Sequence, residues 1–427
     1  MKMSRLIIKV VHQLYNIGFN MALPGVLMRL LVRSRRECGY RKNMAERLGC
    51  YRRPARPAAL WFHAVSMGEV MALKTLIDQQ SQHHSVVLTT MTPSGWSTAK
   101  SLFGDAIQSV YVPYDIPWIL RRFLRAFKPQ ALIIMETEIW PNMLHAAQRA
   151  KLPVALINAR ISDRSYPSYA RYRTLMADLL QSIQVIMAQS QKDADRFRHM
   201  GADPAKIQVV PNIKFSNVIE SDEVVTDIGD RRLLWVAGST HEGEEARLIH
   251  VHQCVQKKHP QARWILVPRH ISRVPTLEKL LVEKGLSYQT CTSVGEMDAA
   301  LSNHSVCLLA ATGLLNECYA MARLAFVGGS WVPVGGHNLI EPAAWGTITT
   351  SGPELANCLA VRDTLLGGQA LYVVEEAQGL VELIDRAFSD TGWLKQASCA
   401  SKKAVLAAKA CSLSSVEAWI NHLFFIQ

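Results

Sequence analysis

Several stretches of this sequence end an apolar run and open a helix with residues that could move a proton. In WFHAVSMGEVMALKTLI (61–77) a strand is predicted to end near His63, and Ser66 and Glu69 open the following helix. A carboxylate at a ligand site suits a general base. The spacing of Ser66 and Glu69 also matches a capping box, in which both side chains cap the helix. Both roles are open, and they would compete for one carboxylate.

Two further strand ends supply carboxylates and a cation. METEIWPN (135–142) places Glu136 and Glu138 two apart, and side chains so spaced on an extended chain point the same way. INARISDRS (157–165) carries Arg160 at the end of the next predicted strand. Neighbouring strand ends meet at one edge of a parallel sheet, so we expect Arg160 to pair with these carboxylates. Such a pair would be structural or would shape an acceptor pocket.

A hydroxyl and a lysine follow other strands of the first half. MTPSGWSTAK (91–100) places Thr92 where it could contact a polar ligand, although an ordinary helix start explains it equally well. PNIKF (211–215) supplies Lys214 just before the polar stretch 216–231, which we interpret as a linker between two domains. Lone lysines usually face solvent, but this one lies where two domains should meet.

The second half is richer in cationic and amide groups. VAGSTHEGEE (236–245) is a glycine-containing strand-to-helix turn, and WILVPRHISR (264–273) carries Arg269 and His270 directly after a strand. In GGSWVPVGGHNLIEPAAWG (328–346), Pro342 is tolerated only in a first helical turn, which predicts a helix start close to 338–341. Exposed amides at such a start suit a phosphate. Alternatively, Asn338 and Glu341 simply cap the helix.

One acidic motif imitates a metal site. KDADRF (192–197) contains Asp193 and Asp195 in the Asp-x-Asp pattern that holds a metal-bound nucleotide in some sugar transferases. On a helix these two side chains point about 200° apart and could not grip one ion together. We interpret them as the acidic first turn of a helix that Ser190 caps.

The overall composition is that of a globular protein of two or three domains. The chain has 427 residues, of which 49% are hydrophobic and 19% charged, and a net charge of +12. Thirteen Lys or Arg but only two acids lie in residues 1–56, beside an apolar segment, which favours anionic lipid over nucleic acid as the partner. The nine cysteines are scattered and form no CxxC pair, as expected of free thiols in a reducing compartment.

The apolar segment LIIKVVHQLYNIGFNMALPGVLMRLL (6–31) is long enough to cross a bilayer, but it contains several polar residues, and Pro24–Gly25 should break it. We expect a signal-anchor or an interfacial helix, with the basic cluster on the cytoplasmic side. A helix buried against the soluble body is the alternative.

Short apolar runs alternate with helical stretches through the rest of the chain, which predicts two α/β halves with parallel sheets. We expect two Rossmann-like domains facing each other across a cleft, with ligands at the carboxyl ends of the strands. The expected organisation is an anchor (1–50), an acceptor domain (51–215), a linker (216–231), a donor domain (232–400) and C-terminal helices near 390–412 and 413–425, residues 401–427 packing back on the first domain.

Together these motifs resemble the Kdo transferases, the 3-deoxy-D-manno-octulosonic acid transferases of lipopolysaccharide inner-core synthesis. The resemblance runs through most of the chain and includes HAVSMGEV, TTMTPSGW, METEIWPN, INARISDRS, NIKF, GSTHEGEE, PRH and FVGGSWVPVGGHNLIEPAAWG. It implies a GT-B fold, a protein on the cytoplasmic face of the inner membrane, and transfer of Kdo from CMP-Kdo to a lipid A precursor of the lipid IVA type. It also implies inversion at the anomeric carbon without a metal or other cofactor.

Carried over by motif, the resemblance implies that Glu69 is the catalytic base. The residues implied on the donor side are Lys214, Gly238, Ser239, Arg269, His270, Gly329, Ser330, Gly336, His337, Asn338 and Glu341. Those implied on the acceptor side are Ser66, Gly68, Thr92, Glu138 and Arg160. The cations could balance the charges of the CMP phosphate and the sugar carboxylate in place of a metal.

Two stretches depart from the family pattern. Pro211 stands where the family usually has glycine, and AATGLL (310–315) replaces a pattern with acidic residues. Either nucleotide binding differs locally, or Glu317 compensates from one turn away. Two other functions stay open: a nucleotide-sugar epimerase on the same double-Rossmann plan, and a non-enzymatic basic tether for lipid or nucleic acid. The sequence does not specify an oligomeric state.

Overall fold

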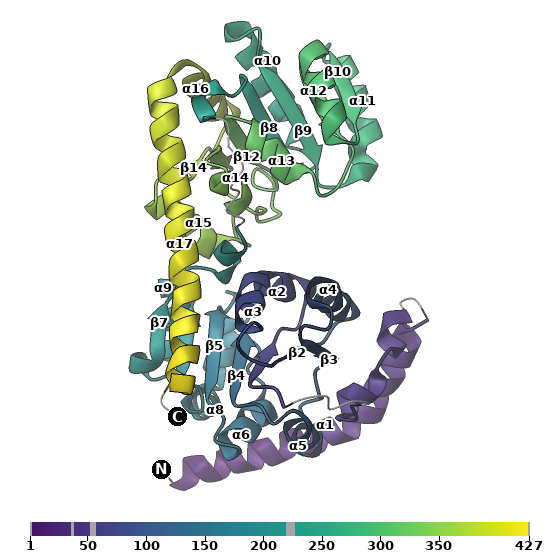
Figure 1. Cartoon of the computed structure of the whole chain (residues 1–427), viewed down its shortest axis with the longest axis vertical. Coiled ribbons are helices and arrows are strands. Elements are labelled where there is room, and N and C mark those ends of the chain that lie inside the picture. The colour runs from purple at the N-terminus through teal and green to yellow at the C-terminus, as the bar shows by residue number, and fades with distance from the viewer. Residues whose placement is uncertain (1, 36–37, 52–56, 219–226, 426–427) are drawn as a thin grey trace. The chain divides into compact units, whose positions relative to one another are not determined.

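The computed structural model describes residues 2–35, 38–51, 57–218 and 227–425 of the chain (Figure 1). These residues form two compact units: unit 1 is Met1–Asn217 with Cys411–Gln427, and unit 2 is Val218–Ala410. Each unit is a parallel sheet with helices on both faces, which confirms the two expected Rossmann-like domains. The expected linker at 216–231 stays a prediction, because residues 219–226 lie outside the described part of the chain.

Seven parallel strands form the sheet of unit 1, in the order β3-β2-β1-β4-β5-β6-β7. Their bounds are Leu60–His63 (β1), Val86–Thr90 (β2), Gln108–Tyr111 (β3), Ala131–Met135 (β4), Val154–Ala159 (β5), Val185–Ala188 (β6) and Ile207–Val209 (β7). The first six coincide with the predicted apolar runs, because parallel strands are buried on both faces and are apolar throughout. The sequence did not predict β7, because two residues of this edge strand are exposed and it lacks an apolar run.

The helices of unit 1 cover both faces of this sheet (Figure 1). Alternating side chains of β1 serve both faces: Trp61 belongs to one buried cluster with Phe123, whereas Phe62 belongs to the other. The helices are α2 (Met67–Ala72), α3 (Lys74–Gln80), α4 (Pro93–Phe103), α5 (Pro117–Phe127), α6 (Pro141–Arg149), α7 (Tyr166–Arg171), α8 (Arg173–Gln181) and α9 (Gln191–His199). Proline stands in the first turn of α4 to α7, where its missing N–H costs nothing.

The N-terminal helix α1 (Lys2–Arg33) turns several of its polar side chains inward and many apolar ones outward. His12 Nε2 lies 2.8 Å from Asn142 Oδ1, and the Tyr15 hydroxyl donates to Asp115 Oδ2 at 2.9 Å. The exposed apolar side chains include Leu6, Val10, Val11, Leu14, Ile17, Met21, Met28, Leu31 and Val32. Some of the polar interruptions, such as His12 and Asn16, are therefore contacts with the rest of unit 1, whereas Gln13 is exposed.

The helix continues through Pro24, contrary to the expected break. Apolar residues on both sides of Pro24, including Phe19 and Leu27, pack against Tyr114 and Ile119 and hold both halves of the helix in place. Within the described residues, no helix combines the length and apolar character needed to cross a membrane.

Unit 2 repeats the plan of unit 1, with strand order β10-β11-β9-β8-β12-β13-β14. The strands are Leu234–Thr240 (β8), Arg263–Pro268 (β9), Tyr288–Cys291 (β10), Val306–Leu309 (β11), Leu324–Val327 (β12), Ile348–Ser351 (β13) and Tyr372–Val373 (β14). The helices are α10 (Glu245–Lys258), α11 (Val274–Glu283), α12 (Val294–Asn303), α13 (Leu315–Met321), α14 (Ile340–Ala344), α15 (Leu359–Gly367) and α16 (Ala377–Ser389). The sequence did not predict β10, β13 and β14, whose polar or very short sequences lack an apolar run.

One helix, α17 (Thr391–Phe425), stands where two were expected. No glycine or proline follows Gly392, so nothing interrupts the helix at the predicted division near residue 412. Its last part belongs to unit 1, where Leu413, Val416 and Ile420 join the buried cluster beneath α2 and α3.

We predict that Gly238→Ala destabilises unit 2, because a Cβ on this residue of β8 would lie 2.3 Å from the buried Tyr319 hydroxyl. Overpacking of this kind costs about 1–3 kcal/mol, which should lower the urea unfolding midpoint. Gly295→Ala in α12 is the matched control, since no atom lies within 4 Å of its added Cβ. Equal midpoints for the two variants would contradict the account of Gly238.

Candidate active site

In each sheet the chain first adds strands on one side of a central strand and then crosses to the other side, and ligands of open α/β sheets bind at this switch point, outside the carboxyl ends of the strands. In unit 1 this switch point lies between β1 and β4, and in unit 2 between β8 and β12. The loops that follow these four strands carry most of the residues singled out in the sequence.

In unit 1, Glu69 lies in the first turn of α2 with Ser66 as N-cap. The Val65 amide donates to Glu69 Oε2 at 2.9 Å, and the Ser66 hydroxyl donates to Glu69 Oε1 at 2.8 Å. The side chain therefore does cap the helix, as one of the two alternatives held. Burial raises the pKa of Glu69, these two hydrogen bonds lower it in part, and the nearby charge of Glu136 raises it further. A carboxylate with a raised pKa is a better proton acceptor, so capping and a base role are compatible.

The loop after β4 brings two more carboxylates to the same edge of the sheet. The expectation that Glu136 and Glu138 extend the strand is wrong, because β4 ends at Met135 and Glu136 has the left-handed φ of 53°. Glu136 Oε2 lies 3.9 Å from Arg160 Nε, which confirms the expected pairing of Arg160 with a carboxylate.

Glu138 Oε2 accepts a hydrogen bond from Trp140 Nε1 at 2.8 Å. Burial raises the pKa of Glu138 to about 7; the Trp140 bond opposes this rise, and the charges of Glu69 and Glu136 add to it. Electrostatic coupling of Glu69 and Glu138 means that protonation of one favours ionisation of the other. The site can therefore hold one proton and one carboxylate base near neutral pH.

Other acceptor-side residues serve mainly as caps in this structure. Thr92 is the N-cap of α4: its hydroxyl accepts from the Gly95 amide at 3.0 Å and donates to the Val65 carbonyl at 3.3 Å. Gly68 lies exposed in the first turn of α2, where a Cβ would meet only open space and the Ser66 hydroxyl at 4.0 Å.

Lys214 is exposed on a 3₁₀ turn (Ile213–Asn217) that a buried amide network holds. The Asn212 side chain accepts from the Lys214 amide at 3.0 Å and donates to Gln189 Oε1 at 2.9 Å. Asn158, at φ 51°, accepts from the Ile213 amide at 3.1 Å. The network fixes the backbone of Lys214 and leaves its ammonium group accessible to a ligand.

In unit 2, the buried carboxylate of Glu244 binds four backbone amides. Its Oε2 accepts from His241 at 2.9 Å and from Gly329 at 2.8 Å, and its Oε1 accepts from Ser330 and Trp331 at 3.0 Å each. The amides of Gly329 and Ser330 are therefore not available to a ligand anion, which corrects the interpretation of this glycine turn. The Gly336 amide is also engaged, since it donates to the Gly329 carbonyl at 2.7 Å.

The helix predicted near 338–341 is α14, which begins at Ile340. Asn338 Oδ1 accepts from the Ile340 amide at 3.1 Å, so Asn338 satisfies the first helical N–H as the capping alternative held. Glu341 does not cap a backbone amide in the same way, because its Oε1 accepts from Asn338 Nδ2 at 2.8 Å, and the N-cap residue is Leu339. Burial raises the pKa of Glu341. Gly238 is a packing glycine under Tyr319, and Ser239 at φ 57° lies at the bulge where β8 ends.

Three imidazoles and an arginine gather above this turn. His241 Nε2 lies 2.8 Å from His337 Nε2, the two rings are nearly parallel with their centroids 5.1 Å apart, and His270 meets His241 edge-on at 5.9 Å. Arg269 is exposed, and no side-chain hydrogen bond or ion pair holds it within the described residues, whereas Arg273 is paired with Glu242 and Glu245. These groups can receive a phosphate or carboxylate that the engaged glycine amides cannot.

The two aspartates of the Asp-x-Asp motif in α9 have separate partners. Asp193 is buried and accepts from the Ile161 amide at 2.9 Å, while Asp195 accepts from Gln191 at 3.0 Å and pairs with Arg198. This confirms the first-turn interpretation of the Asp-x-Asp motif. Glu317 is exposed on α13, and its compensation for the altered AATGLL stretch stays a prediction.

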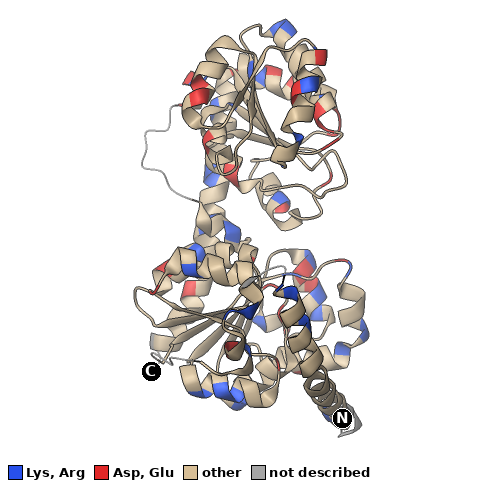
Figure 2. Ribbon diagram, turned by 90° about the vertical axis from the view of Figure 1, so that its right-hand side faces the viewer, with Lys and Arg blue, Asp and Glu red and all other residues tan. Residues whose placement is uncertain are grey.

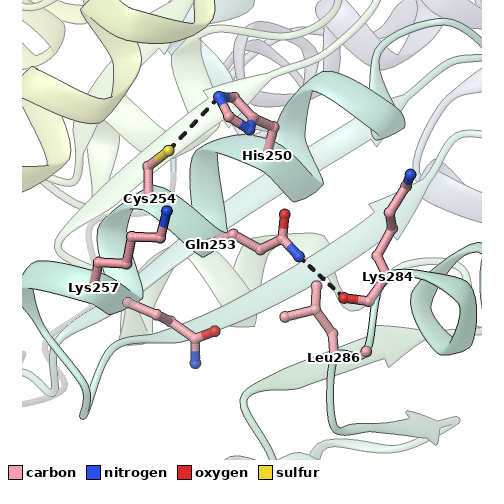
Figure 3. A pocket seen from close by; sticks show the side chains of 8 residues that line it. His250, Gln253, Cys254, Lys257, Lys284 and Leu286 are labelled. Carbon is pink, nitrogen blue, oxygen red and sulfur yellow. Dashed lines mark hydrogen bonds between the residues drawn. The ribbon is translucent and has the colours of Figure 1, made fainter.

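A hollow of about 480 Å³ lies elsewhere in unit 2, between α10 and the end of α11 (Figure 3). Gln253 donates to the Lys284 carbonyl at 3.0 Å along its floor, and His250 Nε2 lies 3.6 Å from Cys254 Sγ. None of the predicted site residues lines it.

The comparison with known proteins agrees with this geometry. A family model described as 3-deoxy-D-manno-octulosonic-acid transferase (kdotransferase) matches residues 42–217. The 3-deoxy-D-manno-octulosonic acid transferase of Haemophilus influenzae is 32% identical over 355 residues, which cover 80% of this chain and 82% of that protein. That of Bordetella pertussis is 34% identical over 338 residues, 75% and 77% of the two chains. The chain belongs to the Kdo transferase family.

Solved structures confirm the fold of this family member. UDP-GlcNAc 2-epimerase from Neisseria meningitidis is 14% identical, with a TM-score of 0.58 over 85% of this chain and 99% of that one. A glycosyltransferase from Rickettsia africae is also 14% identical, with a TM-score of 0.56 over 86% and 98%. Likeness at this level of identity establishes the double-Rossmann architecture and nothing about substrates.

Three residues of the site were not identified from the sequence: Glu244, His241 and Trp140. Glu244 follows His241 by three positions, the same spacing as Ser66 and Glu69, so the signal for a helix-start carboxylate was present in GSTHEGEE. Trp140 gave no signal, because its role depends on the turn that brings its indole to Glu138.

We predict that Glu244→Gln destabilises unit 2 by about 3 kcal/mol, because an amide offers one acceptor oxygen where four backbone N–H groups need two. Urea unfolding followed by tryptophan fluorescence measures the change, since Trp331 lies in the affected turn. Glu242→Gln is the control, because the Glu242 side chain is 88% exposed. A Glu244→Gln midpoint equal to that of the control would show that the carboxylate does not hold the turn.

Proposed function

We propose that this chain transfers Kdo from CMP-Kdo to a hydroxyl of a lipid A precursor of the lipid IVA type, in lipopolysaccharide inner-core synthesis. The observation that carries the proposal is the half-buried Glu69 carboxylate, held by Val65 and Ser66 in a chain of the Kdo transferase family. The names of the relatives state the transferred sugar. The donor nucleotide and the lipid acceptor are the substrates that the motifs imply.

In the proposed reaction, the Glu69 carboxylate removes the proton from the acceptor hydroxyl as its oxygen attacks the anomeric carbon of Kdo. The bond from that carbon to the CMP phosphate oxygen breaks, and CMP leaves as an anion. Attack from the face opposite the leaving group inverts the anomeric centre. Because burial raises the pKa of Glu69, the rate should rise with pH through that pKa, as Glu69 loses its proton.

Cations of this chain would stabilise the departing phosphate without a metal ion. Arg269, with no partner of its own among the described residues, and the exposed Lys214 are the candidates, with His337 beside Arg269. Support for a metal-free reaction comes from Asp193 and Asp195, whose carboxylates are engaged separately, the first by the Ile161 amide and the second by Gln191.

A nucleotide-sugar epimerase is the less supported alternative. It rests on the fold that this chain shares with UDP-GlcNAc 2-epimerase at 14% identity. The relatives at 32% and 34% identity are transferases. Product formation that needs a lipid acceptor separates the two functions.

We further propose that α1 lies in the cytoplasmic face of the inner membrane with its apolar side outward. The support is the reversed amphipathicity of this helix, whose polar residues His12 and Tyr15 bind unit 1 while Leu14, Ile17 and Met21 are exposed. Lys and Arg also outnumber Asp and Glu over unit 1, whereas both signs are interspersed over unit 2 (Figure 2). Anionic phospholipid attracts such a basic surface.

We predict that Glu69→Gln lowers the transfer rate about 10²–10⁴-fold, because the amide cannot accept the hydroxyl proton. Binding of CMP-Kdo should change little, since the Gln side chain can still accept from the Val65 amide and can donate its NH2 to the Ser66 hydroxyl oxygen, which keeps the helix start in place. Transfer is measured by mass spectrometry of the lipid product, and binding by calorimetry. Asp78→Asn, an exposed carboxylate of unit 1, is the control. Near-normal transfer by Glu69→Gln would exclude Glu69 as the base.

We predict that Leu14→Ser, Ile17→Ser and Met21→Ser together weaken binding to phosphatidylglycerol vesicles at least about tenfold, because apolar area no longer enters the lipid. Co-sedimentation at fixed salt measures this. Gln13→Ser, an exposed polar site on the same helix, should bind as the wild type does. Unchanged binding by the triple variant would mean that another surface contacts the membrane.

A further inference from the structure

The His241–His337 contact holds one hydrogen between two nitrogens. The Nε2 atoms lie 2.8 Å apart and the rings are nearly parallel, with an interplanar angle of 7°. An imidazole nitrogen either carries a hydrogen or accepts one. A contact of this length therefore requires that one Nε2 donates and the other accepts.

This geometry limits how many protons the pair can take. The neutral pair has one N–H on each ring, and adding one proton to the free Nδ1 of the donating ring leaves the Nε2 contact unchanged. A second added proton would place hydrogens on both Nε2 atoms and break the contact. The pair is therefore built to switch between charges of 0 and +1.

The surroundings keep the pair neutral while the site is empty of anions. Burial, the neighbouring imidazoles and the cationic Arg269 lower the pKa of both imidazoles, that of His337 to about 4, and Arg273 adds to the effect at His241. Glu244 opposes this effect from below. Burial and the arginines together outweigh the single carboxylate, so both imidazoles are neutral at neutral pH. Arg269 still gives the site a positive potential.

We propose that the His241–His337 pair takes up one proton when the anionic donor binds, which makes His241 a further donor-binding residue. The inference rests on the proposed function, because the ligand it needs is CMP-Kdo beside Arg269 and His337. The phosphodiester and the carboxylate of the donor place negative charge against the pair. That charge favours the imidazolium form, and the added positive charge then strengthens binding of the donor.

The direction of the pH effect follows from linkage. The pair is neutral in the free protein at neutral pH, and the bound anion raises its proton affinity, so binding weakens as pH rises through the pKa of the complex. One linked proton corresponds to a rise in the donor Kd of at most about tenfold per pH unit. Both donor anions stay ionised between about pH 6 and 8, so the proton that is taken up belongs to the protein.

The test is calorimetric binding of CMP-Kdo to the full chain without acceptor, at one pH in buffers of different ionisation enthalpy. The slope of heat against buffer enthalpy counts the protons. The wild type should take up a fraction of a proton that approaches one as pH falls toward 6, whereas His241→Gln should take up none and bind several-fold more weakly. His250→Gln, in the separate hollow on α10, is the matched control and should behave as the wild type.

The outcomes separate this inference from the proposed function. Wild-type binding without linked protons, or equal uptake by wild type and His241→Gln, would overturn the paired role while transfer of Kdo still stands. Absence of both binding and product with the wild type would remove the proposed function as well. If His241→Gln unfolds, His337→Gln removes the other imidazole of the pair. We expect this variant to take up no proton on binding CMP-Kdo either.

Discussion

In each unit one glutamate carboxylate satisfies backbone N–H groups where the first strand turns into a helix, and the candidate site depends on how completely it does so. Glu244 is fully buried and accepts four amides, so its oxygens have no capacity left for a ligand. Glu69 occupies the corresponding place after β1 and accepts from one amide and one hydroxyl. The Glu244 carboxylate therefore stabilises the glycine turn, whereas the Glu69 carboxylate keeps the capacity to accept a proton.

This difference gives the two units different chemistry on the same fold. In unit 1, burial raises the pKa of Glu69 and of Glu138, the charge of Glu136 raises both further, and Glu69 adds to the rise at Glu138, which favours proton transfer near neutral pH. In unit 2, Glu244 pins the glycine turn beneath imidazoles and Arg269, so anion binding falls to side chains and not to the amides of that turn. This difference supports the proposal that one domain supplies a base for the acceptor and the other supplies cations for the donor.

Much of the architecture could be predicted from the sequence, because buried parallel strands are continuous apolar runs. The prediction failed for strands that are not apolar. β13 is buried although its sequence is Ile-Thr-Thr-Ser, and β7 lies at an edge of its sheet with two exposed residues. The polar residues of α1 were interpreted as interruptions of a membrane segment, whereas two of them, His12 and Asn16, form hydrogen bonds with Asn142. The capping role of Asn338 was foreseen, but the use of the Gly329 amide by Glu244 was not, because that contact joins residues 85 positions apart.

The central claim is that this chain joins Kdo to a lipid acceptor. The most direct test incubates the purified full chain with CMP-Kdo and a lipid A precursor, with and without a chelator, and weighs the lipid by mass spectrometry. The account predicts a mass gain of one or more Kdo units that the chelator does not change, and no consumption of CMP-Kdo by epimerisation. An unchanged acceptor mass with folded protein and intact donor would contradict it.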